Sequence, residues 1–558
     1  MKIFLSVLLA LALFIPLPAL AVDSADLANK IDELSKELGR MKQQMQEMQK
    51  KDETKEQRIT TVEKTATEAK KPSAIEIGGD YQFRLDSLKG NVPGYMQYTG
   101  APSTGYMPMM PGMLMNLYTA GQPHFTAKND TIMLNRFGLN LKARATEDVT
   151  VKARLLMYKT FGGSDSSAVT STFFSPEKSG VFDGNVSHIP QDNTLRVDQA
   201  FATWSNVFNA PVWFSIGRRP STGGVPSNLR RNAEPLGSAG VPALLIDYAF
   251  DGMTLGVAPD IEALPGAFAK LCYGRGFDSG YRVSGMGGSL KDTDMIGINV
   301  TPYSADNLRV ELQWNRAFNM MSNPPIAGVW GDVQANVGDI DQLGTNVMGK
   351  INDLGPGDLN LFASAAMSKT HPNNNGYQLP FYDVCIDANM NNICDPAEMQ
   401  MIANPAQFGL LYDDVNFGGE KKGKTGTAFY LGARYDIKST ATKIGAEYNH
   451  GSKNWISFGP ANDDLISGKL GTRGDVFETY VIQELKQKAI SKYGKAYFRL
   501  GYQHYKFAYT GSNGWLGAPK KISDLTATPT TMADFLATQM YSPLKKASNI
   551  YLTFNVEF

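Results

Sequence analysis

Oxygen-bearing side chains recur at a regular spacing between Asp387 and Glu398. Counted from Asp387, they occupy positions 1, 3, 5, 9 and 12 of a twelve-residue segment, and position 7 can offer a backbone carbonyl. This is the ligand spacing of an EF-hand-type calcium loop, although Asn392 stands where glycine is usual. No helical pattern flanks the segment, so the sequence predicts a free-standing calcium loop, with an Asn-rich turn as the alternative. The predicted ligands are Asp387, Asn389, Asn391, the carbonyl of Ile393, Asp395 and Glu398.

Of the three cysteines, Cys385 lies two residues before this segment and Cys394 lies within it. Oxidising conditions outside the cytoplasm favour disulfides, so an exported chain is predicted to join these two cysteines. Closing a loop of about ten residues would stabilise the segment by roughly 2 to 3 kcal/mol. The third cysteine, Cys272, falls in a strand pattern and is interpreted as a small packing residue.

The remaining reactive residues do not indicate catalysis. The sequence contains no C-x-x-C-H motif, so we expect no haem attached to this chain. It also lacks G-x-S-x-G, H-E-x-x-H and phosphate-loop motifs, and its five histidines are scattered. We therefore expect that the protein is not an enzyme.

Basic side chains form a second candidate site. They cluster as two doublets in and after one predicted strand, and they also recur on the polar faces of two other predicted strands. If these strands enclose a pore, the side chains would form a basic constriction that favours anions. The alternative is that acids balance them, as the totals of 54 basic and 54 acidic residues allow. The predicted constriction residues are Arg136, Lys142, Arg144, Arg154, Arg218, Arg219, Arg230 and Arg231.

The elements that precede these residues indicate export and a helical stem. Residues 1–21 combine a basic start, an apolar run and an A-x-A-like ending, which is typical of a signal peptide. From Leu27 to Ala69 apolar residues alternate at four and three residue spacings, with Asp52 and Lys55 filling two core positions. This period predicts a coiled coil over residues 22–71, although a single solvated helix is the alternative.

After Pro72 the period changes to two. Apolar residues alternate with polar ones in many short stretches, and no later stretch is apolar enough for a membrane helix. The final stretch alternates up to the terminal Phe558, an ending that resembles the assembly signal of outer-membrane barrels. These patterns predict an all-β transmembrane barrel of about 18 antiparallel strands, or 16, either of which would leave a water-filled lumen.

The predicted strands are joined by short turns at one end and long loops at the other. Predicted short turns include Asp251-Gly252, and predicted strands include residues 242–250 and 281–290. The barrel is expected to span residues 72–558. The long extracellular loops are expected at residues 87–131, 162–193, 220–241, 319–343, 370–425, 451–474 and 510–547.

The sequence resembles a family of little-characterised bacterial outer-membrane porins. That family is similar in length and layout, with a leader, a helical start and a terminal barrel, and its shared motifs name no solute. The resemblance rests on residues 135–137, 143–150, 154, 157–159 and 217–222.

Taken together, these patterns predict a porin in the outer membrane of a Gram-negative cell, with a periplasmic stem. It would pass small hydrophilic solutes or ions by diffusion. By analogy with porins, we expect it to form a trimer. Expected partners are outer-membrane lipid, further copies of the chain, the barrel-assembly machinery and the cell wall. Two alternatives are a structural tether of the envelope and a sheath for a partner electron carrier. Zero net charge argues against nucleic acid as a partner.

Overall fold

The computed structural model describes most of the chain from residue 75 onward. The chain divides into two units, Met1–Ser73 and Ala74–Phe558, and the predicted signal peptide and stem lie outside the described residues. The described residues are 75–98, 107–110, 113–116, 119–165, 167, 169, 174, 188–233, 241–280, 290–322, 335–378, 382–391, 393–395, 397–402, 407–413, 420–459, 463–535 and 537–558.

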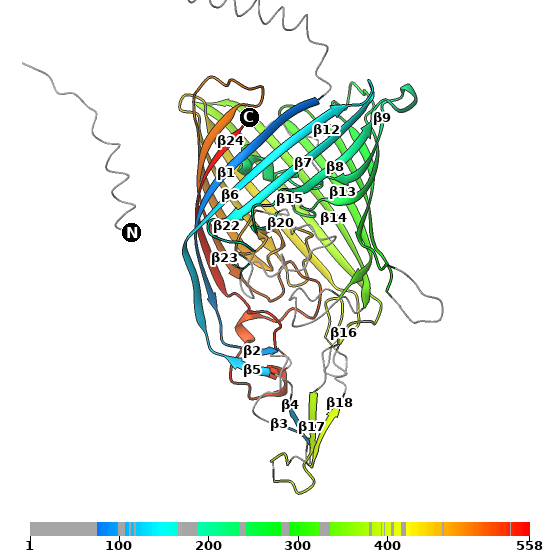
Figure 1. Cartoon of the computed structure of the whole chain (residues 1–558), viewed down its shortest axis with the longest axis vertical. Coiled ribbons are helices and arrows are strands. Elements are labelled where there is room, and N and C mark those ends of the chain that lie inside the picture. Colours follow the sequence, from blue (N-terminus) through cyan, green and yellow to red (C-terminus); the bar gives the residue numbers. More distant parts are fainter. Residues whose placement is uncertain are drawn as a thin grey trace, which may run out of the picture. The chain divides into compact units, whose positions relative to one another are not determined.

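The second unit is a closed antiparallel barrel of sixteen strands (Figure 1). Each strand pairs with its neighbour in the sequence, and β1 closes the barrel by pairing with β24 from Asp80–Glu557 to Asn91–Lys546. The barrel strands are β1 (Ile75–Val92), β6 (Phe125–Arg144), β7 (Val149–Thr160), β8 (Arg196–Trp204), β9 (Val212–Arg219), β10 (Phe250–Val257), β11 (Phe268–Phe277), β12 (Thr293–Ser304), β13 (Leu308–Met321), β14 (Asn336–Leu354), β15 (Gly357–Pro372), β20 (Thr425–Ile437), β21 (Thr442–Gly451), β22 (Gly474–Glu484), β23 (Lys495–Phe507) and β24 (Lys546–Glu557).

Alternation of side chains along each strand produces the two faces of the barrel, because successive residues of a strand point to opposite sides. In β15, Leu361 and Met367 are 41% and 40% exposed on the outer face, whereas Ser364 and Ser368 are almost fully buried. Ser368 points inward, since its hydroxyl accepts a hydrogen bond from the backbone N–H of Ile456 inside the barrel. The sequence pattern therefore correctly predicts an apolar outer face and a polar inner face.

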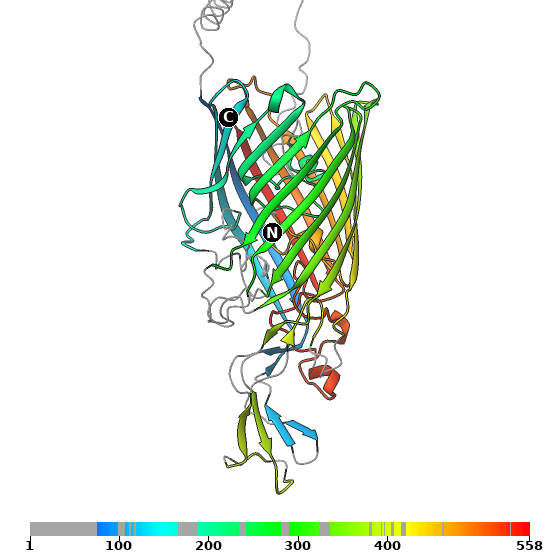
Figure 2. The ribbon, with the colours of Figure 1, turned by 90° about the vertical axis from the view of Figure 1, so that its right-hand side faces the viewer.

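The two ends of the barrel differ in their connections. Short turns such as residues 145–148, 355–356 and 438–441 lie at the end where the chain enters β1 and leaves β24. We call this the short-turn end. At the opposite, long-loop end, the connections contribute three small sheets, β2–β5, β16–β19 and β18–β17–β4–β3, which lie beyond the barrel wall (Figures 1 and 2). The strands of these sheets are β2 (Tyr95–Tyr98), β3 (Met107–Met110), β4 (Met113–Asn116), β5 (Thr119–Gln122), β16 (Tyr377–Gln378), β17 (Tyr382–Ile386), β18 (Met399–Ile402) and β19 (Gln407–Phe408).

Helices are few and short in the described part of the chain. They are η3 (Val207–Asn209), α3 (Ser227–Arg231), η5 (Lys469–Gly471), η6 (Ile522–Asp524) and α4 (Met532–Phe535). Among the described residues, none of these helices has the length and apolar character that crossing a membrane requires.

The strand count is sixteen, the smaller of the two predicted numbers. Residues 242–249 are not a strand but an irregular segment inside the barrel, and Phe250 begins β10. The predicted turn at Asp251-Gly252 is therefore wrong, because both residues lie in β10 and pair with β9. β11 pairs directly with β12, so the barrel closes without a strand at 281–290, and most of that segment lies outside the described residues. A mostly apolar run is interpreted as a buried strand from sequence, but the apolar side chains of this run are buried by packing inside the barrel.

Candidate functional site

Two connections at the long-loop end fold back into the barrel. They join β9 to β10 (residues 220–249) and β21 to β22 (residues 452–473), and we call their described parts the lumen plug. The two segments pair through their backbones: Phe458 N donates to Leu245 O at 2.9 Å, and Asp247 N donates to Phe458 O at 2.8 Å. The plug is thus one structure made from two distant parts of the sequence.

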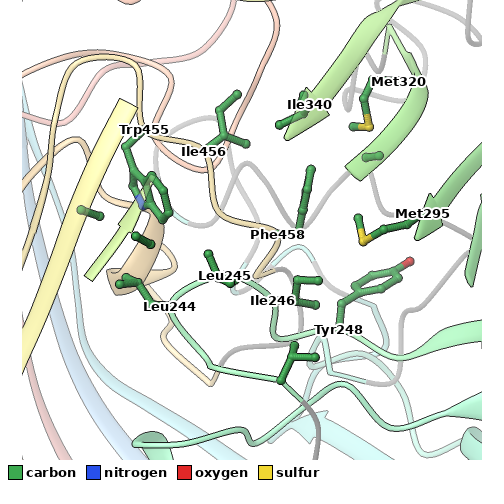
Figure 3. Close-up of a cluster of buried hydrophobic side chains, with 14 of the residues drawn as sticks. Leu244, Leu245, Ile246, Tyr248, Met295, Met320, Ile340, Trp455, Ile456 and Phe458 are labelled. Carbon is green, nitrogen blue, oxygen red and sulfur yellow. The ribbon is translucent and has the colours of Figure 1, made fainter. Parts of the chain in front are cut away.

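The plug has an apolar core that packs on the inner wall (Figure 3). Leu245, Trp455 and Ile456 are completely buried, and they belong to the same cluster as Met320 of β13 and Ile340 of β14. The indole N–H of Trp455 donates to the carbonyl of Leu470 at 2.8 Å, so its polar atom is satisfied within the plug. Each fully buried side chain of this size contributes about 1.5 to 3 kcal/mol, so the plug is held firmly.

A second apolar cluster fills the lumen near the long-loop end. Inward-facing Leu88, Leu134 and Tyr505 of the wall pack there with Leu465 and Ile466 of the plug. The prediction of a water-filled lumen is therefore wrong for this part of the barrel. The sequence pattern predicts polar side chains at every inward-facing position of a strand. At these inward-facing positions the side chains are apolar, and they pack against the plug.

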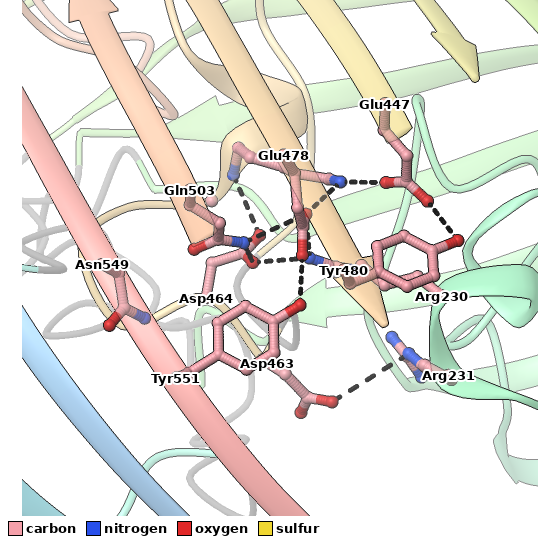
Figure 4. A network of polar contacts seen from close by, with 12 residues as sticks. Arg230, Arg231, Glu447, Asp463, Asp464, Glu478, Tyr480, Gln503, Asn549 and Tyr551 are labelled. Atoms are coloured by element: carbon pink, nitrogen blue, oxygen red, sulfur yellow. Dashed lines mark hydrogen bonds and ion pairs between the residues drawn. The ribbon is translucent and has the colours of Figure 1, made fainter. Parts of the chain in front are cut away.

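Buried ion pairs fasten the plug to the wall (Figure 4). Arg230 of α3 lies 2.8 Å from Asp464 of the plug and 3.0 Å from Glu478 of β22. Lys469 of η5 reaches Glu478 at 2.6 Å and also contacts Glu447 of β21. Burial opposes ionisation of Asp464, but Arg230, Lys469 and a hydrogen bond from Gln503 together outweigh it, and the pKa of Asp464 is lowered from its ordinary value.

A neighbouring set of charges surrounds Asp463. Arg136 of β6 lies 2.9 Å from Asp463, and Arg231 lies 4.0 Å from Asp463 and 3.2 Å from Asp247. Burial disfavours the charged form of Asp463, yet Arg136 and Arg231 hold the pKa of its carboxyl well below its usual range. The basic doublet Arg230-Arg231 is thus matched by the acidic doublet Asp463-Asp464.

Three of the predicted constriction residues, Arg136, Arg230 and Arg231, are therefore brought together at the plug. Their acidic partners were not predicted as site residues. The doublet Asp463-Asp464 was the available signal, but sequence spacing alone does not show that two long loops meet inside the barrel.

The other predicted constriction residues lie apart from the plug. Lys142 pairs with Glu76 at 3.2 Å, and Arg154 pairs with Asp80 at 2.7 Å. Arg144 is exposed at the end of β6.

The doublet at the end of β9 is split between the two faces of the barrel wall. Arg219 stacks over the ring of Phe201, with 4.9 Å between the guanidinium carbon and the ring centre. Arg218 follows the outward register of Ile216 and lies 3.4 Å from Asp251. Arg218 therefore does not join the lumen residues.

A chamber of about 620 Å³ lies at the short-turn end of the lumen. Its wall carries basic and acidic side chains together with three tyrosines and the terminal Phe558. Lys142 and Arg154 reach it with their acidic partners, and Asp463 and Arg231 form its inner end. The charged residues that line the chamber are Glu76, Asp80, Arg136, Lys142, Lys152, Arg154, Arg231, Asp463, Arg499 and Glu557.

The predicted disulfide is confirmed, because Cys385 and Cys394 are joined. Among the described residues no three His, Cys, Asp or Glu side chains converge as a metal site. The carboxylate of Glu398 instead accepts hydrogen bonds from the backbone N–H groups of Ala388 and Asp395, at 3.2 and 3.3 Å. Asp387 and Asn389 both accept from the N–H of Asn391. Calcium binding by this loop stays a prediction.

The terminal residue is built into the wall. Phe558 N donates to Gly79 O at 3.0 Å, Gly79 N donates to Phe558 O at 2.8 Å, and the Phe558 ring stacks on Phe137. Its role as an assembly signal stays a prediction. Cys272 is a free cysteine in β11, as expected.

The chain belongs to the DUF3373 family, described as proteins of unknown function, whose model matches residues 126–558. No curated protein has a sequence that matches this chain.

Several solved outer-membrane proteins are similar in structure. The anion-selective porin from Comamonas acidovorans is 10% identical with a TM-score of 0.38, and the match covers 87% of this chain and 99% of the porin. OprB of Pseudomonas putida, in a high-pH structure, is also 10% identical with a TM-score of 0.38, covering 87% of this chain and 94% of OprB. OmpT of Vibrio cholerae, an outer membrane protein, is 11% identical with a TM-score of 0.35, covering 88% and 99%.

Proposed function

We propose that this chain is an outer-membrane channel for small hydrophilic solutes or ions, and that the lumen plug restricts passage through it. The observation that carries the proposal is the closed barrel with an apolar outer face and a polar inner face. Lipid favours such an outer face, and a polar interior suits water and solutes.

The plug determines how such a channel would behave. Inner-wall side chains all around the barrel, including Gln313, Asn346, Arg434 and Asn549, are buried at 2% exposure or less. A freely open pore would leave inner-wall side chains of this kind in contact with water. We therefore expect a low conductance at rest, and a larger one when the plug is displaced.

Planar-bilayer conductance of the full chain tests the proposal. The barrel register allows a clean deletion of the 452–473 segment of the plug, because Gly451 of β21 and Gly474 of β22 are directly paired. Replacing residues 452–473 by an Asn-Gly turn should keep the wall intact and raise the conductance severalfold, since two-residue hairpin turns join adjacent antiparallel strands. A matched control replaces residues 383–401, whose flanking residues Tyr382 and Ile402 are also paired, outside the barrel.

Each outcome is informative. The control variant should conduct like the full chain. If neither the full chain nor the plug deletion conducts although both fold as barrels, the channel proposal is wrong. If the full chain conducts as well as the plug deletion, the plug does not restrict passage.

A further inference from the structure

A second cavity, of about 180 Å³, lies among the loops at the long-loop end. It is formed mainly by the connection between β23 and β24, with residues from the 407–413 segment and the end of the plug. Its lining is rich in aromatic rings, which are Phe408, Phe507, Tyr509, Trp515 and Tyr541. A cavity of about 150 Å³ is large enough to hold benzene, so this one has room for a single substituted ring.

Arg473 lies at the wall of this cavity and is only 1% exposed. Its guanidinium donates to three backbone carbonyls, those of Trp455 at 3.1 Å, Thr510 at 3.0 Å and Gly514 at 2.7 Å. A guanidinium has more N–H donors than these carbonyls use. Gly511, with φ +71°, passes so close that an added Cβ would lie 2.8 Å from Nη1 of Arg473.

Among the described residues, Arg473 forms no ion pair, unlike other basic side chains that are equally buried. Arg434 contacts Asp436 at 2.7 Å, and Lys469 contacts Glu478 at 2.6 Å. Burying a charge without a counter-ion is costly, and a bound anion would relieve that cost. Burial lowers the pKa of Arg473 to about 9, so the side chain remains positively charged at neutral pH.

The other charges of the cavity cancel. Lys520 contacts the carboxylate of Asp413, which also accepts a hydrogen bond from the backbone N–H of Ala518 at 2.8 Å. Asp413 is therefore occupied by Lys520 and not by Arg473. The cavity keeps one positive charge beside a set of aromatic rings.

We propose that this cavity binds a small aromatic carboxylate, with its ring between the aromatic side chains and its carboxylate on Arg473. Charge-assisted hydrogen bonds between a guanidinium and a carboxylate are among the strongest polar contacts in proteins. The aromatic walls provide edge and face contacts for the ring. This inference is independent of the proposed channel function, because it rests only on the loops at one end.

Isothermal titration of the full chain in detergent with benzoate tests the site, with benzyl alcohol as the uncharged probe of similar shape. We expect the dissociation constant of benzoate to be at least about tenfold lower than that of benzyl alcohol. The reason is that only benzoate can form charge-assisted hydrogen bonds with the guanidinium. Arg473→Gln should abolish that preference. Lys521→Gln removes an exposed charge next to the cavity but outside its lining, and it should leave the preference unchanged.

Ala518→Trp provides a test that keeps Arg473 in place. Ala518 lines the cavity, so an indole there should fill it and remove benzoate binding. Equal binding of benzoate and benzyl alcohol to the full chain, no binding of either, or unchanged benzoate binding by Ala518→Trp would each overturn the proposal.

Discussion

At the scale of single residues, the plug shows how buried charges can be held inside a barrel. Lys469 and Arg230 share Glu478, and each also has its own acidic partner, Glu447 or Asp464. Such pairs give little net stability compared with apolar packing, but breaking one of them is expensive because it leaves an uncompensated charge. The network therefore determines the position of the plug in the lumen, and it contributes little to the free energy of unfolding.

Lys469→Met should release the η5 part of the plug. It leaves Glu447 and Glu478 buried with one cation fewer, and losing one partner of a buried pair costs about 3 to 5 kcal/mol. Limited proteolysis with mass spectrometry should show faster cleavage within residues 463–473. The exposed Lys521→Met is the matched control and should change nothing. Adding Glu478→Gln to Lys469→Met should restore part of the protection, and the absence of any restoration would contradict the role given to this pair.

The pH dependence of the plug follows from Asp463 and Asp464. Both carboxyls have folded-state pKa values below the ordinary value of 3.8, because the neighbouring cations together outweigh burial. A lowered pKa contributes stability that is present above the unfolded-state value and is lost as the pH falls through the folded-state value. The plug should therefore stay closed from neutral pH down to about pH 4 and loosen only in stronger acid. Conductance that rises between pH 7 and pH 5 would contradict this assignment.

At the scale of elements, the sequence predicts strands better than it predicts the plug. Alternation identifies β15 and β24 because one of their faces is apolar and the other polar. The same reasoning fails at residues 242–249, where a mostly apolar run packs inside the lumen and makes an isolated β-bridge between Ile246 and Phe458. The partner of that run lies more than 200 residues away, and short-range periodicity carries no information about such contacts.

The disulfide-closed loop is the element in which calcium binding can be tested. Glu398 and Asp387 already bond to backbone N–H groups, so calcium would have to compete with those bonds. We expect a dissociation constant in the range of about 0.1 to 1 mM, as for extracellular modules with few carboxylates. Isothermal titration of the oxidised full chain should show this binding, and Asp387→Ala should abolish it. The exposed Asp524→Ala is the control. Equal calcium binding by Asp387→Ala and the full chain would identify the segment as an ordinary Asn-rich turn.

At the scale of the whole molecule, the filled lumen argues against one of the three functions that the sequence left open. A sheath for a partner electron carrier needs a lumen that another protein can enter, and the plug packs against the inner wall with two apolar clusters. A narrow channel is compatible with the plug, because a chamber of about 620 Å³ remains at the short-turn end. An envelope tether is equally compatible with a closed barrel, and conductance distinguishes the two.

The oligomeric state provides the last prediction. Residues 74–558 form a compact unit of their own, in which β1 closes the barrel by pairing with β24. If the heptads of the predicted stem set the oligomer, deleting residues 22–71 should give monomeric barrels whose conductance per barrel is unchanged. Light scattering in detergent measures the mass of both forms. Leu34→Asn with Leu38→Asn, at predicted core positions, should have the same effect, whereas Glu33→Asn with Glu37→Asn should not. An oligomer of unchanged mass after the deletion would show that the association lies in the barrel wall.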